Sequence, residues 1–437
     1  MNDKEYVVDN LQLASGKYIL PISTLEAIKI STDDSSKSLK EVLTKNRIPL
    51  DYELYSYKVN IKDSNPQTRI SYFDMAEGRK PAFWDYTNGY FNFGDWSYAF
   101  FMDAFPCMVK YDGTIDYKLD PNNYTLKETG GKSDLINKDY EGSAMVAFPT
   151  IWIKRWQDDN YLYVSICNKQ LDEDFHAYMH TNADGKVCKY KFVGMYFSTL
   201  FIDRYKSLAE QTFTVAQTFD KEMLYSKANG ENWDIFGWSD LATIGDLLTL
   251  ISKSDDTQKS FGFGLNANGA RVGNTDPGKI QFGGPFFNNA PLNTNSYQKI
   301  FHMNNLFCNQ YTRLGGLIYL NGKYFVKPYP PYSETTETYT KLNLTDSDST
   351  AEITGASGGF IKGTSVNQYG RFPVVLGGGA TTYECDSVLY ANNVIAIAKT
   401  RGVYSASTNA GKLSLILSNT SAADGNCASR LVCFSTE

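Results

Sequence analysis

The C-terminal end of the chain, residues 383–434, most constrains the fold, because short apolar runs alternate there with loops of small polar residues. The runs are 394–398, 413–417 and 430–434, and the loops are 399–412 and 418–429. Runs of about five β-favouring residues bounded by Gly, Asn and Ser are typical of buried strands. Loops rich in Ser, Gly, Asn and Tyr are typical of binding surfaces. This end therefore predicts a rigid sheet that presents binding loops, with no obvious catalytic group.

The length and charge of the chain limit the kinds of protein it can be. Its 437 residues exceed one ordinary domain, so we expect two or three structural units. A net charge of -6 argues against a nucleic-acid partner, because phosphates are bound by a basic face. No segment approaches the ~18 apolar residues of a membrane span. The polar start of the chain also lacks the apolar core of a signal peptide.

The seven cysteines are odd in number and scattered, and no CxxC pair occurs. This usage favours buried free thiols in a protein made in a reducing cytoplasm over a disulfide framework. One question stays open. Neighbouring strands could bring Cys385 close to either Cys427 or Cys433.

Residue composition and the pattern of predicted elements divide the chain into three parts. These are an N-terminal region over 1–63, a linker over 64–83 and a large domain over 84–437. The N-terminal region carries two short amphipathic helical turns, near 24–30 and 38–43, and then one strand within 50–63. Helices this short cannot hold a core alone. They must pack on a partner or on copies of themselves.

The large domain has the pattern of an α+β fold. Hairpins are predicted at 108–117, with Asp112-Gly113 at the turn, and at 149–166. A helix is predicted from Thr214 to the Asn229-Gly230 stop, and a second runs from about Ser239 to Ile251 with apolar residues on one face.

Motifs that carry chemistry are incomplete. His176 and His180 share one face of a helix or strand, but no Glu follows the first His as in a metalloprotease motif. The segment 130–133 lacks the first Gly of a phosphate-binding loop. Aspartates at 112, 116 and 120 lack the loop of a known calcium site, and bound calcium stays open. No carboxylate pair is marked for glycoside hydrolysis. We expect no cofactor, no metal site and no catalytic residue.

Several sequence blocks together resemble one family. These are 91–96, 106–124, 140–145, 151–154, 191–196, 233–251, 321–325, 381–386 and 429–431. On these blocks the chain resembles virion proteins of gut bacteriophages that carry a C-type-lectin-like domain, related in fold to formylglycine-generating enzymes and to receptor-binding proteins diversified by phage retroelements. Cys308 stands where this fold usually has a Gly, and the cysteine pair of the enzymes is not recognisable. A formylglycine-type oxidase activity is therefore not expected.

The resemblance implies a C-type-lectin-like domain of mixed short-stranded sheets with two helices, and a non-enzymatic tail- or head-fibre or receptor-binding protein. Residues 17–46 resemble a virion-attachment segment, so residues 1–60 are expected to bind other virion proteins. A homotrimer is expected, located in the virion after assembly in the bacterial host cytoplasm. The C-terminal domain is expected to bind a ligand on the host surface. A glycan is the first expectation, and a host protein is the alternative.

By the family's pattern, display positions fall on the loops 386–393, 399–412 and 418–427. Polar residues there are expected to hydrogen-bond sugar hydroxyls, and Tyr390 and Tyr404 to stack on rings. The residues expected to contact ligand are Asp386, Tyr390, Asn392, Asn393, Arg401, Tyr404, Asn409 and Asn419. The alternative for each of these residues is a solvated loop position that contacts no ligand. Two other functions stay open: a purely architectural capsid-decoration or baseplate subunit whose loops bind another virion protein, and an enzyme acting on cell-wall glycans.

Overall fold

Strands dominate the fold. The computed structural model describes residues 29–32, 35–38, 52–262, 287–288, 298–346, 349–350, 358–392, 394–402, 409–418 and 421–436. The chain is 41% strand and 11% helix, with many antiparallel sheets and three α-helices in the described residues. The predicted α+β class, a C-type-lectin-like domain with two helices, is therefore wrong. Many short segments without a strong local pattern are strands because distant segments complete their hydrogen-bond ladders.

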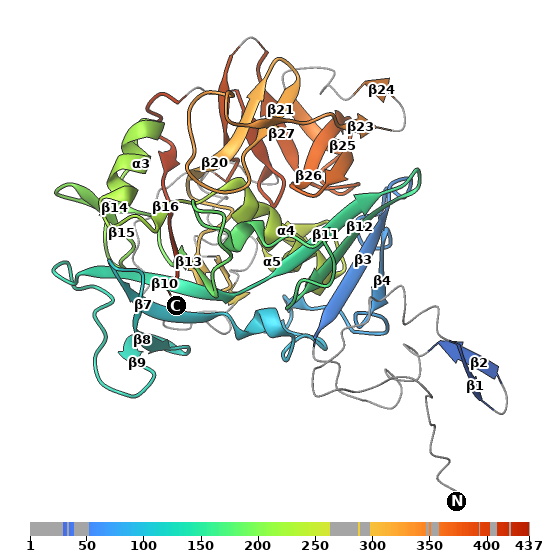
Figure 1. Ribbon diagram of the computed structural model, residues 1–437, viewed down its shortest axis with the longest axis horizontal. Helices are drawn as coiled ribbons and strands as arrows, with labels where there is room; N and C mark the ends of the chain where they lie inside the picture. Colours follow the sequence, from blue (N-terminus) through green and yellow to red (C-terminus); the bar gives the residue numbers. More distant parts are fainter. Residues whose placement is uncertain are drawn as a thin grey trace, which may run out of the picture.

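A seven-stranded sheet forms one side of the molecule (Figure 1). Its order is β16 (Trp233–Ile235), β31 (Leu431–Phe434), β13 (Tyr190–Gly194), β10 (Gly142–Pro149), β7 (Phe105–Lys110), β8 (Ile115–Asp120) and β9 (Asn123–Lys127). The hairpin predicted at 108–117 is confirmed as β7–β8, with Gly113 at a positive φ of 81° in its turn. The last strand of the chain, β31, is inserted between β16 and β13.

A four-stranded sheet projects beside it, in the order β11 (Trp152–Gln157), β12 (Tyr161–Cys167), β3 (Leu54–Asn60) and β4 (Ile70–Asp74). The predicted hairpin at 149–166 is confirmed as β11–β12, and the strand within 50–63 is β3. β3 pairs with β12 along its whole length. Residues expected in the N-terminal region and in the linker thus share one sheet with residues of the large domain.

The nine-stranded sheet lies across the molecule from the other two (Figure 1). Its order is β22 (Thr340–Lys341), β21 (Lys323–Val326), β20 (Tyr311–Leu320), β28 (Ala396–Thr400), β29 (Leu415–Leu417), β27 (Ser387–Tyr390), β25 (Gly358–Asn367) and β26 (Gly370–Leu376), with β30 (Cys427–Ala428) on β20. The apolar runs at 394–398, 413–417 and 430–434 are confirmed as strands. However, β28 and β29 belong to this sheet and β31 to the seven-stranded one.

The smaller elements are short hairpins, one three-stranded sheet and helical turns that do not belong to these sheets. They are β1 (Lys29–Thr32) with β2 (Ser35–Ser38), β5 (Phe83–Asp85) with β6 (Tyr90–Asn92), β14 (Thr199–Phe201) with β15 (Arg204–Lys206), β17 (Phe287–Asn288) with β18 (Lys299–Ile300) and β19 (Met303–Asn304), β23 (Thr345–Asp346) with β24 (Ser349–Thr350), and the 3₁₀ turns η1 (Phe100–Asp103) and η2 (Tyr178–His180). The helical turns expected near 24–30 and 38–43 fall largely outside the described residues; β1 and β2 overlap their ends.

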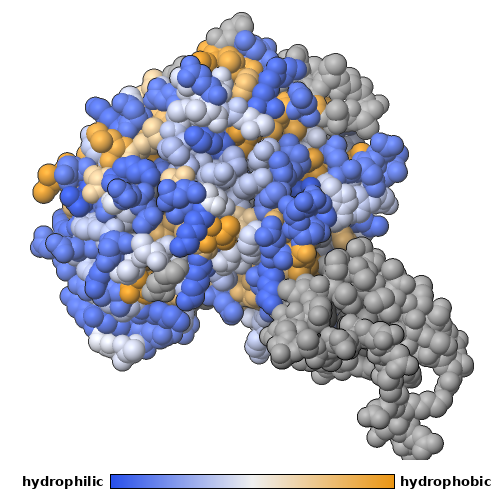
Figure 2. Space-filling model, in the orientation of Figure 1, coloured by the Kyte–Doolittle hydropathy of each residue, from blue (hydrophilic) through white to orange (hydrophobic). Residues whose placement is uncertain are grey.

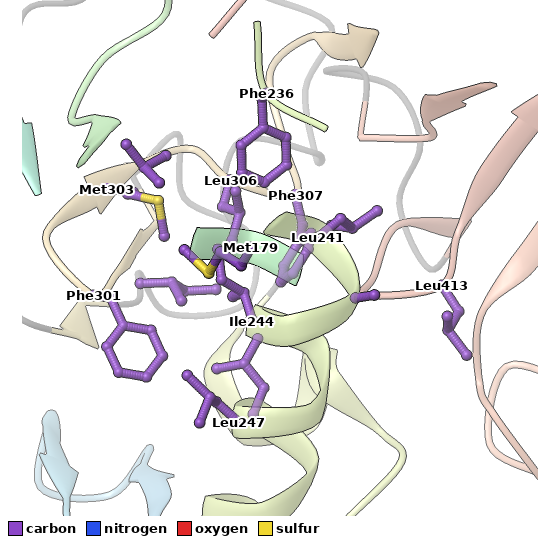
Figure 3. Packing of buried hydrophobic residues seen from close by; sticks show 14 of the residues in the cluster. Met179, Phe236, Leu241, Ile244, Leu247, Phe301, Met303, Leu306, Phe307 and Leu413 are labelled. Atoms are coloured by element: carbon purple, nitrogen blue, oxygen red, sulfur yellow. The ribbon is translucent and has the colours of Figure 1, made fainter. Parts of the chain in front are cut away.

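Helix α4 (Trp238–Ser252) is the centre of the core, and every one of its residues is buried. Figure 3 shows Leu241, Ile244 and Leu247 on the helix close to Met179 and Phe307 from other elements. This helix confirms the one expected from Ser239 to Ile251. Its apolar face lies between the sheets, so they share one principal core.

The other expected helix is shorter than its sequence pattern. Helix α3 (Phe219–Lys227) begins after Thr218 rather than at Thr214. Val215 instead bridges to Ala428, and Ala216 has a positive φ of 60° that interrupts a helix. A third helix, α5 (Thr257–Phe261), follows α4 after a short connection. Among the described helices, none has the length and apolar character to cross a membrane.

All seven cysteines are buried free thiols, so Cys385 pairs with neither Cys427 nor Cys433.

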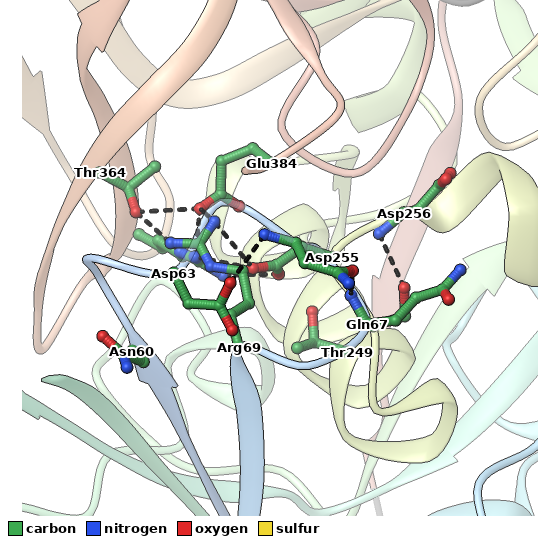
Figure 4. A network of polar contacts seen from close by, with 12 residues as sticks. Asn60, Asp63, Gln67, Arg69, Thr249, Asp255, Asp256, Thr364 and Glu384 are labelled. Atoms are coloured by element: carbon green, nitrogen blue, oxygen red, sulfur yellow. Dashed lines mark hydrogen bonds and ion pairs between the residues drawn. The ribbon is translucent and has the colours of Figure 1, made fainter. Parts of the chain in front are cut away.

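A buried ionic cluster joins segments from across the chain (Figure 4). Its centre is Asp255, in the connection between α4 and α5. Arg371 of β26 binds both carboxylate oxygens of Asp255 at 2.9 and 3.1 Å, and the Nζ of Lys412 lies 2.6 Å from Oδ1. Arg69, which precedes β4, lies 3.4 Å from Asp255 and 3.2 Å from Glu384. Although burial raises the pKa of Asp255, the three cations together hold it below its usual range.

Replacing Asp255 by Asn should destabilise the whole fold. It would leave Arg69, Arg371 and Lys412 buried around a single carboxylate, and breaking a buried ion pair from one side costs about 3–5 kcal/mol. Urea unfolding followed by Trp fluorescence measures this loss of free energy of unfolding. The matched control is Asp172→Asn, which breaks the exposed 3.0 Å pair with Lys154 and should cost less than about 1 kcal/mol. Equal effects of the two substitutions would contradict the central role of Asp255.

Candidate functional site

An open hollow of about 620 Å³ lies on the nine-stranded sheet, against the loop between β29 and β30. Both the strands and the loop contribute polar and apolar residues to its lining. The lining residues are Tyr311, Leu389, Lys399, Ile416, Ser418, Ala422, Ala423, Asp424, Gly425 and Asn426. Five of them lie between 422 and 426, inside the loop that the sequence marked as a binding surface. This hollow is the candidate site.

The loop beside the hollow is fixed by backbone hydrogen bonds from three other segments. The amide of Phe219, at the start of α3, donates to the carbonyl of Ser421 at 2.9 Å, and the amide of Ala216 donates to that of Asp424 at 3.1 Å. On the other side, the amide of Tyr311 donates to the carbonyl of Asn426 at 2.9 Å. Residues 421–426 therefore have a defined shape before any ligand binds, which lowers the entropy lost on binding.

Buried charges beneath the hollow strengthen this support. Arg313 of β20 and Lys399 of β28 are register partners in the sheet. Arg313 donates to the carbonyl of Ala422 at 3.1 Å and pairs with Glu222 of α3 at 3.0 Å. The Nζ of Lys399 lies 2.7 Å from the carboxylate of Asp424, whose side chain is 17% exposed at the hollow. Sheet, helix and loop are thus tied by one set of ionic contacts.

Two of the residues expected to contact ligand are buried. Asp386 is 1% exposed, and its Oδ2 accepts a hydrogen bond from the amide of Leu413 at 2.7 Å. Burial raises its pKa well above the usual range, although Lys412 opposes this. Tyr390 is 5% exposed and packs edge-on against Tyr319 at 6.2 Å between ring centroids. These two side chains hold the loops and the sheet together and do not form an open surface.

Three of the remaining expected residues lie within the described part of the chain. Asn392 is exposed and Asn409 is half-buried. Arg401 is half-buried and donates to the hydroxyl of Ser387 at 2.6 Å. Burial lowers the pKa of Arg401, opposed by Tyr311, which lines the hollow. Asn393, Tyr404 and Asn419 lie outside the described residues.

The loop 418–429 that the sequence marked borders the hollow, but the sequence prediction did not include the lining side chains Tyr311, Lys399 and Asp424. Asp424 and Lys399 lie within the two loops already marked. Asp424 is the only charged residue of the loop 418–429, which was a usable signal, whereas Lys399 shares its loop with Arg401 and Lys412. Tyr311 lies more than a hundred residues earlier, and only the pairing of β20 with β28 and β30 brings it there.

Metal chemistry finds little support in the described part of the chain, where no group of three or more His, Cys, Asp or Glu side chains is placed to hold an ion. His176 stacks on Tyr178 at 4.7 Å between ring centroids. His180 is fully buried, and burial lowers its pKa to about 3. The two imidazoles that the sequence placed on one face are therefore packed side chains.

No protein-family model matches the chain. No curated protein matches it either.

The charges beneath the hollow predict a pH dependence. Burial raises the pKa of Glu222 to about 7 from an ordinary value of 4.5. Between these pH values the folded protein holds more protons than the unfolded chain, so this carboxyl makes the free energy of unfolding fall as pH rises. Glu222→Gln should abolish this fall, which amounts to at most about 3 kcal/mol. Urea unfolding across the range from about pH 5 to pH 8 tests it.

A matched control for Glu222→Gln is Glu231→Gln, which changes an exposed carboxyl in the same part of the chain. It should keep the pH profile of the unchanged protein. If Glu222→Gln and Glu231→Gln have the same profile, Glu222 does not couple folding to proton binding.

Proposed function

We propose that this chain is a structural protein of a bacteriophage virion, of the fibre or receptor-binding kind, and that the hollow beside 422–426 binds a ligand on the host cell surface. The sequence blocks that resemble phage virion proteins support the first part. The second part rests mainly on one observation: the hollow is built by a loop whose composition is that of a binding surface, and it is preformed.

The chemistry of the lining favours a glycan as the ligand. Asp424, Asn426 and Ser418 offer carboxylate, amide and hydroxyl groups of the type that hydrogen-bond sugar hydroxyls. Tyr311, Leu389 and Ile416 offer apolar surface for the C–H faces of a sugar ring. A half-polar, open hollow suits one or a few sugar units presented at the end of a longer chain.

One face of the molecule has the character of an exposed surface. The face of the molecule in Figure 2 is mostly hydrophilic, with apolar residues dispersed in small groups. A large apolar patch, which would mark a permanent interface, does not stand out among the described residues on that face. Binding there would depend on placed polar contacts, as expected for a reversible ligand.

The proposal includes the arrangement of the whole protein. Residues that precede β3 attach the chain to other virion proteins, the chain assembles as a homotrimer in the bacterial cytoplasm, and the nine-stranded sheet faces outward in the virion. Its role is binding and not catalysis. Should the loops instead dock onto another virion protein, the protein would be an architectural subunit.

Filling the hollow should abolish ligand binding without unfolding the protein. A Cβ added at Gly425, which lines the hollow, would meet no atom within 4 Å, so Gly425→Trp should fold normally and its ring should obstruct the hollow. Binding of the labelled full-length protein to host cells should fall at least ~10-fold, since an obstructed contact group in a hot spot is worth more than about 1.4 kcal/mol. Flow cytometry measures this, and Gly425→Ala is the matched control.

The outcomes separate the candidate functions. Full-length protein is required, because a fragment beginning at residue 84 would lack β3 and β4. Unchanged cell binding by Gly425→Trp would exclude the hollow as the site. No cell binding by the unchanged protein, with tight binding to a purified capsid or tail protein, would favour the architectural role. Loss of host polysaccharide on incubation with pure protein would indicate an enzyme.

The oligomeric state is a separate prediction. The purified full-length chain should have the mass of a trimer by size-exclusion chromatography with light scattering, because the short amphipathic N-terminal turns need partners. A monomer at all concentrations would contradict the trimeric fibre arrangement but would leave the ligand hollow untouched.

A further inference from the structure

A lysine and an aspartate face each other in the protein interior, far in sequence from the loops of the hollow. Lys191 lies on β13 in the seven-stranded sheet and is 1% exposed, and Asp240 lies in the first turn of α4 and is 2% exposed. The Nζ of Lys191 lies 3.5 Å from Oδ1 of Asp240. It also lies 3.4 Å from the centre of the Phe434 ring. The amine is thus enclosed by protein, with one carboxyl oxygen in front of it.

This pair is longer than the closest buried ion pairs of the molecule and is similar in length to the 3.4 Å contact of Arg69 with Asp255. Arg155 approaches Asp246 to 2.7 Å and Lys412 approaches Asp255 to 2.6 Å, whereas Lys191 stays at 3.5 Å. Burial lowers the pKa of Lys191 and raises that of Asp240, so both groups are driven toward their neutral forms. A neutral amine is a nucleophile, and a neutral carboxylic acid has a hydroxyl that can leave as water.

The second oxygen of Asp240 is already held. Oδ2 accepts a hydrogen bond from the amide of Gly237 at 2.7 Å, the reciprocal half of the capping arrangement at the start of α4. This donor would stabilise negative charge on Oδ2 during attack at Cγ, as an oxyanion hole does. Once the amide has formed, the same N–H of Gly237 would donate a hydrogen bond to its carbonyl oxygen.

A second carboxylate lies nearby. Asp234 of β16 is the register partner of Val432, which is in turn the partner of Val193, two residues along β13 from Lys191. Asp234 is therefore on the same face of the sheet as Lys191, and its charge acts on both Lys191 and Asp240. It also pairs with Lys227 at 3.0 Å. Asp234 is therefore the candidate group to carry a proton from the amine to the leaving oxygen.

We propose that Lys191 and Asp240 join themselves covalently, through an amide bond between Nζ and Cγ that the folded chain forms without a cofactor. The nitrogen attacks Cγ, and the Cγ–Oδ1 bond breaks. Oδ1 leaves as water, carrying the proton of the acid and one proton from the amine, which Asp234 transfers. One amide is gained and one water lost, so the reaction needs no oxidant, reductant or activated donor.

The bond would connect two parts that matter for the fold. β13 lies next to β31, the C-terminal strand, and α4 is the helix on which the core is built. The bond would close a loop over the residues between 191 and 240 and restrict the unfolded chain as a disulfide does. Unlike a disulfide, the amide bond would persist under reducing conditions. The seven cysteines of this chain are free thiols and form no cross-link of their own. This inference is independent of the ligand and of the function proposed above.

The mass of the purified full-length protein tests the proposal directly. Under reducing, denaturing conditions the intact mass should lie below the sequence mass by that of one water molecule. Proteolysis should release one branched peptide that contains both Lys191 and Asp240. A full sequence mass in the folded protein would overturn the proposal. So would a water loss that maps elsewhere, for instance to a cyclised Asp-Gly such as Asp424-Gly425.

Substitutions distinguish this bond from a structural ion pair. Lys191→Met and Asp240→Ala should both retain the full mass. Asp240→Asn should lose ammonia in place of water and end at the same mass as the unchanged protein, because the product is the same amide. Asp234→Asn should fold, by circular dichroism, but form the bond more slowly, seen as a larger unlinked fraction soon after synthesis. A bond formed at the unchanged rate in Asp234→Asn would exclude proton transfer by Asp234.

Discussion

The buried cluster around Asp255 is the interaction on which the rest of the structure depends. Arg69 comes from the strand region before β4, Arg371 from β26, Glu384 from the segment before β27, and Lys412 from the loop before β29. One carboxylate beside the central helix thus fixes the edge of the four-stranded sheet and two loops of the nine-stranded sheet. Removing such charges from water is costly, and the cost is offset only when every member is paired. The cluster therefore selects one arrangement of the sheets around α4.

A second ionic set does the same for the candidate site. Glu222, Arg313, Lys399 and Asp424 connect α3, β20, β28 and the loop of the hollow. Both sets converge on the C-terminal third of the chain, where loops would otherwise have many conformations available. Their rigidity has a functional consequence, because a loop that is ordered before binding loses less entropy when the ligand arrives. The shape of the hollow is thus a property of the buried charges below it.

The local sequence pattern was enough to predict the elements whose conformation depends on residues close to them in the sequence. The hairpins β7–β8 and β11–β12, helix α4 and the strands β28, β29 and β31 were all visible in periodicity and turn residues. The fold class was not, since strand pairing depends on distant segments. β20 illustrates this: Gly315 and Gly316 suggest a break, yet a side chain at Gly315 would meet the ring of Tyr332 at 2.3 Å. The glycines let an aromatic ring pack on a strand.

Dependence on distant segments also explains why the side chains of the candidate site were not predicted from the sequence. Asp386 has the residue type of a ligand contact and lies beside a loop, but its carboxyl group turns inward to the amide of Leu413. The backbone at Gly411 lies so close that a Cβ there would be 1.8 Å from Oδ1 of Asp386. A carboxylate, a glycine two residues before its hydrogen-bond donor and a nearby lysine make a structural clamp, and the same residue types make a binding surface. What separates them is burial, which depends on the partner sheet and not on the residues themselves. In this chain, composition therefore marks the polar loops, and packing decides which of their side chains stay exposed.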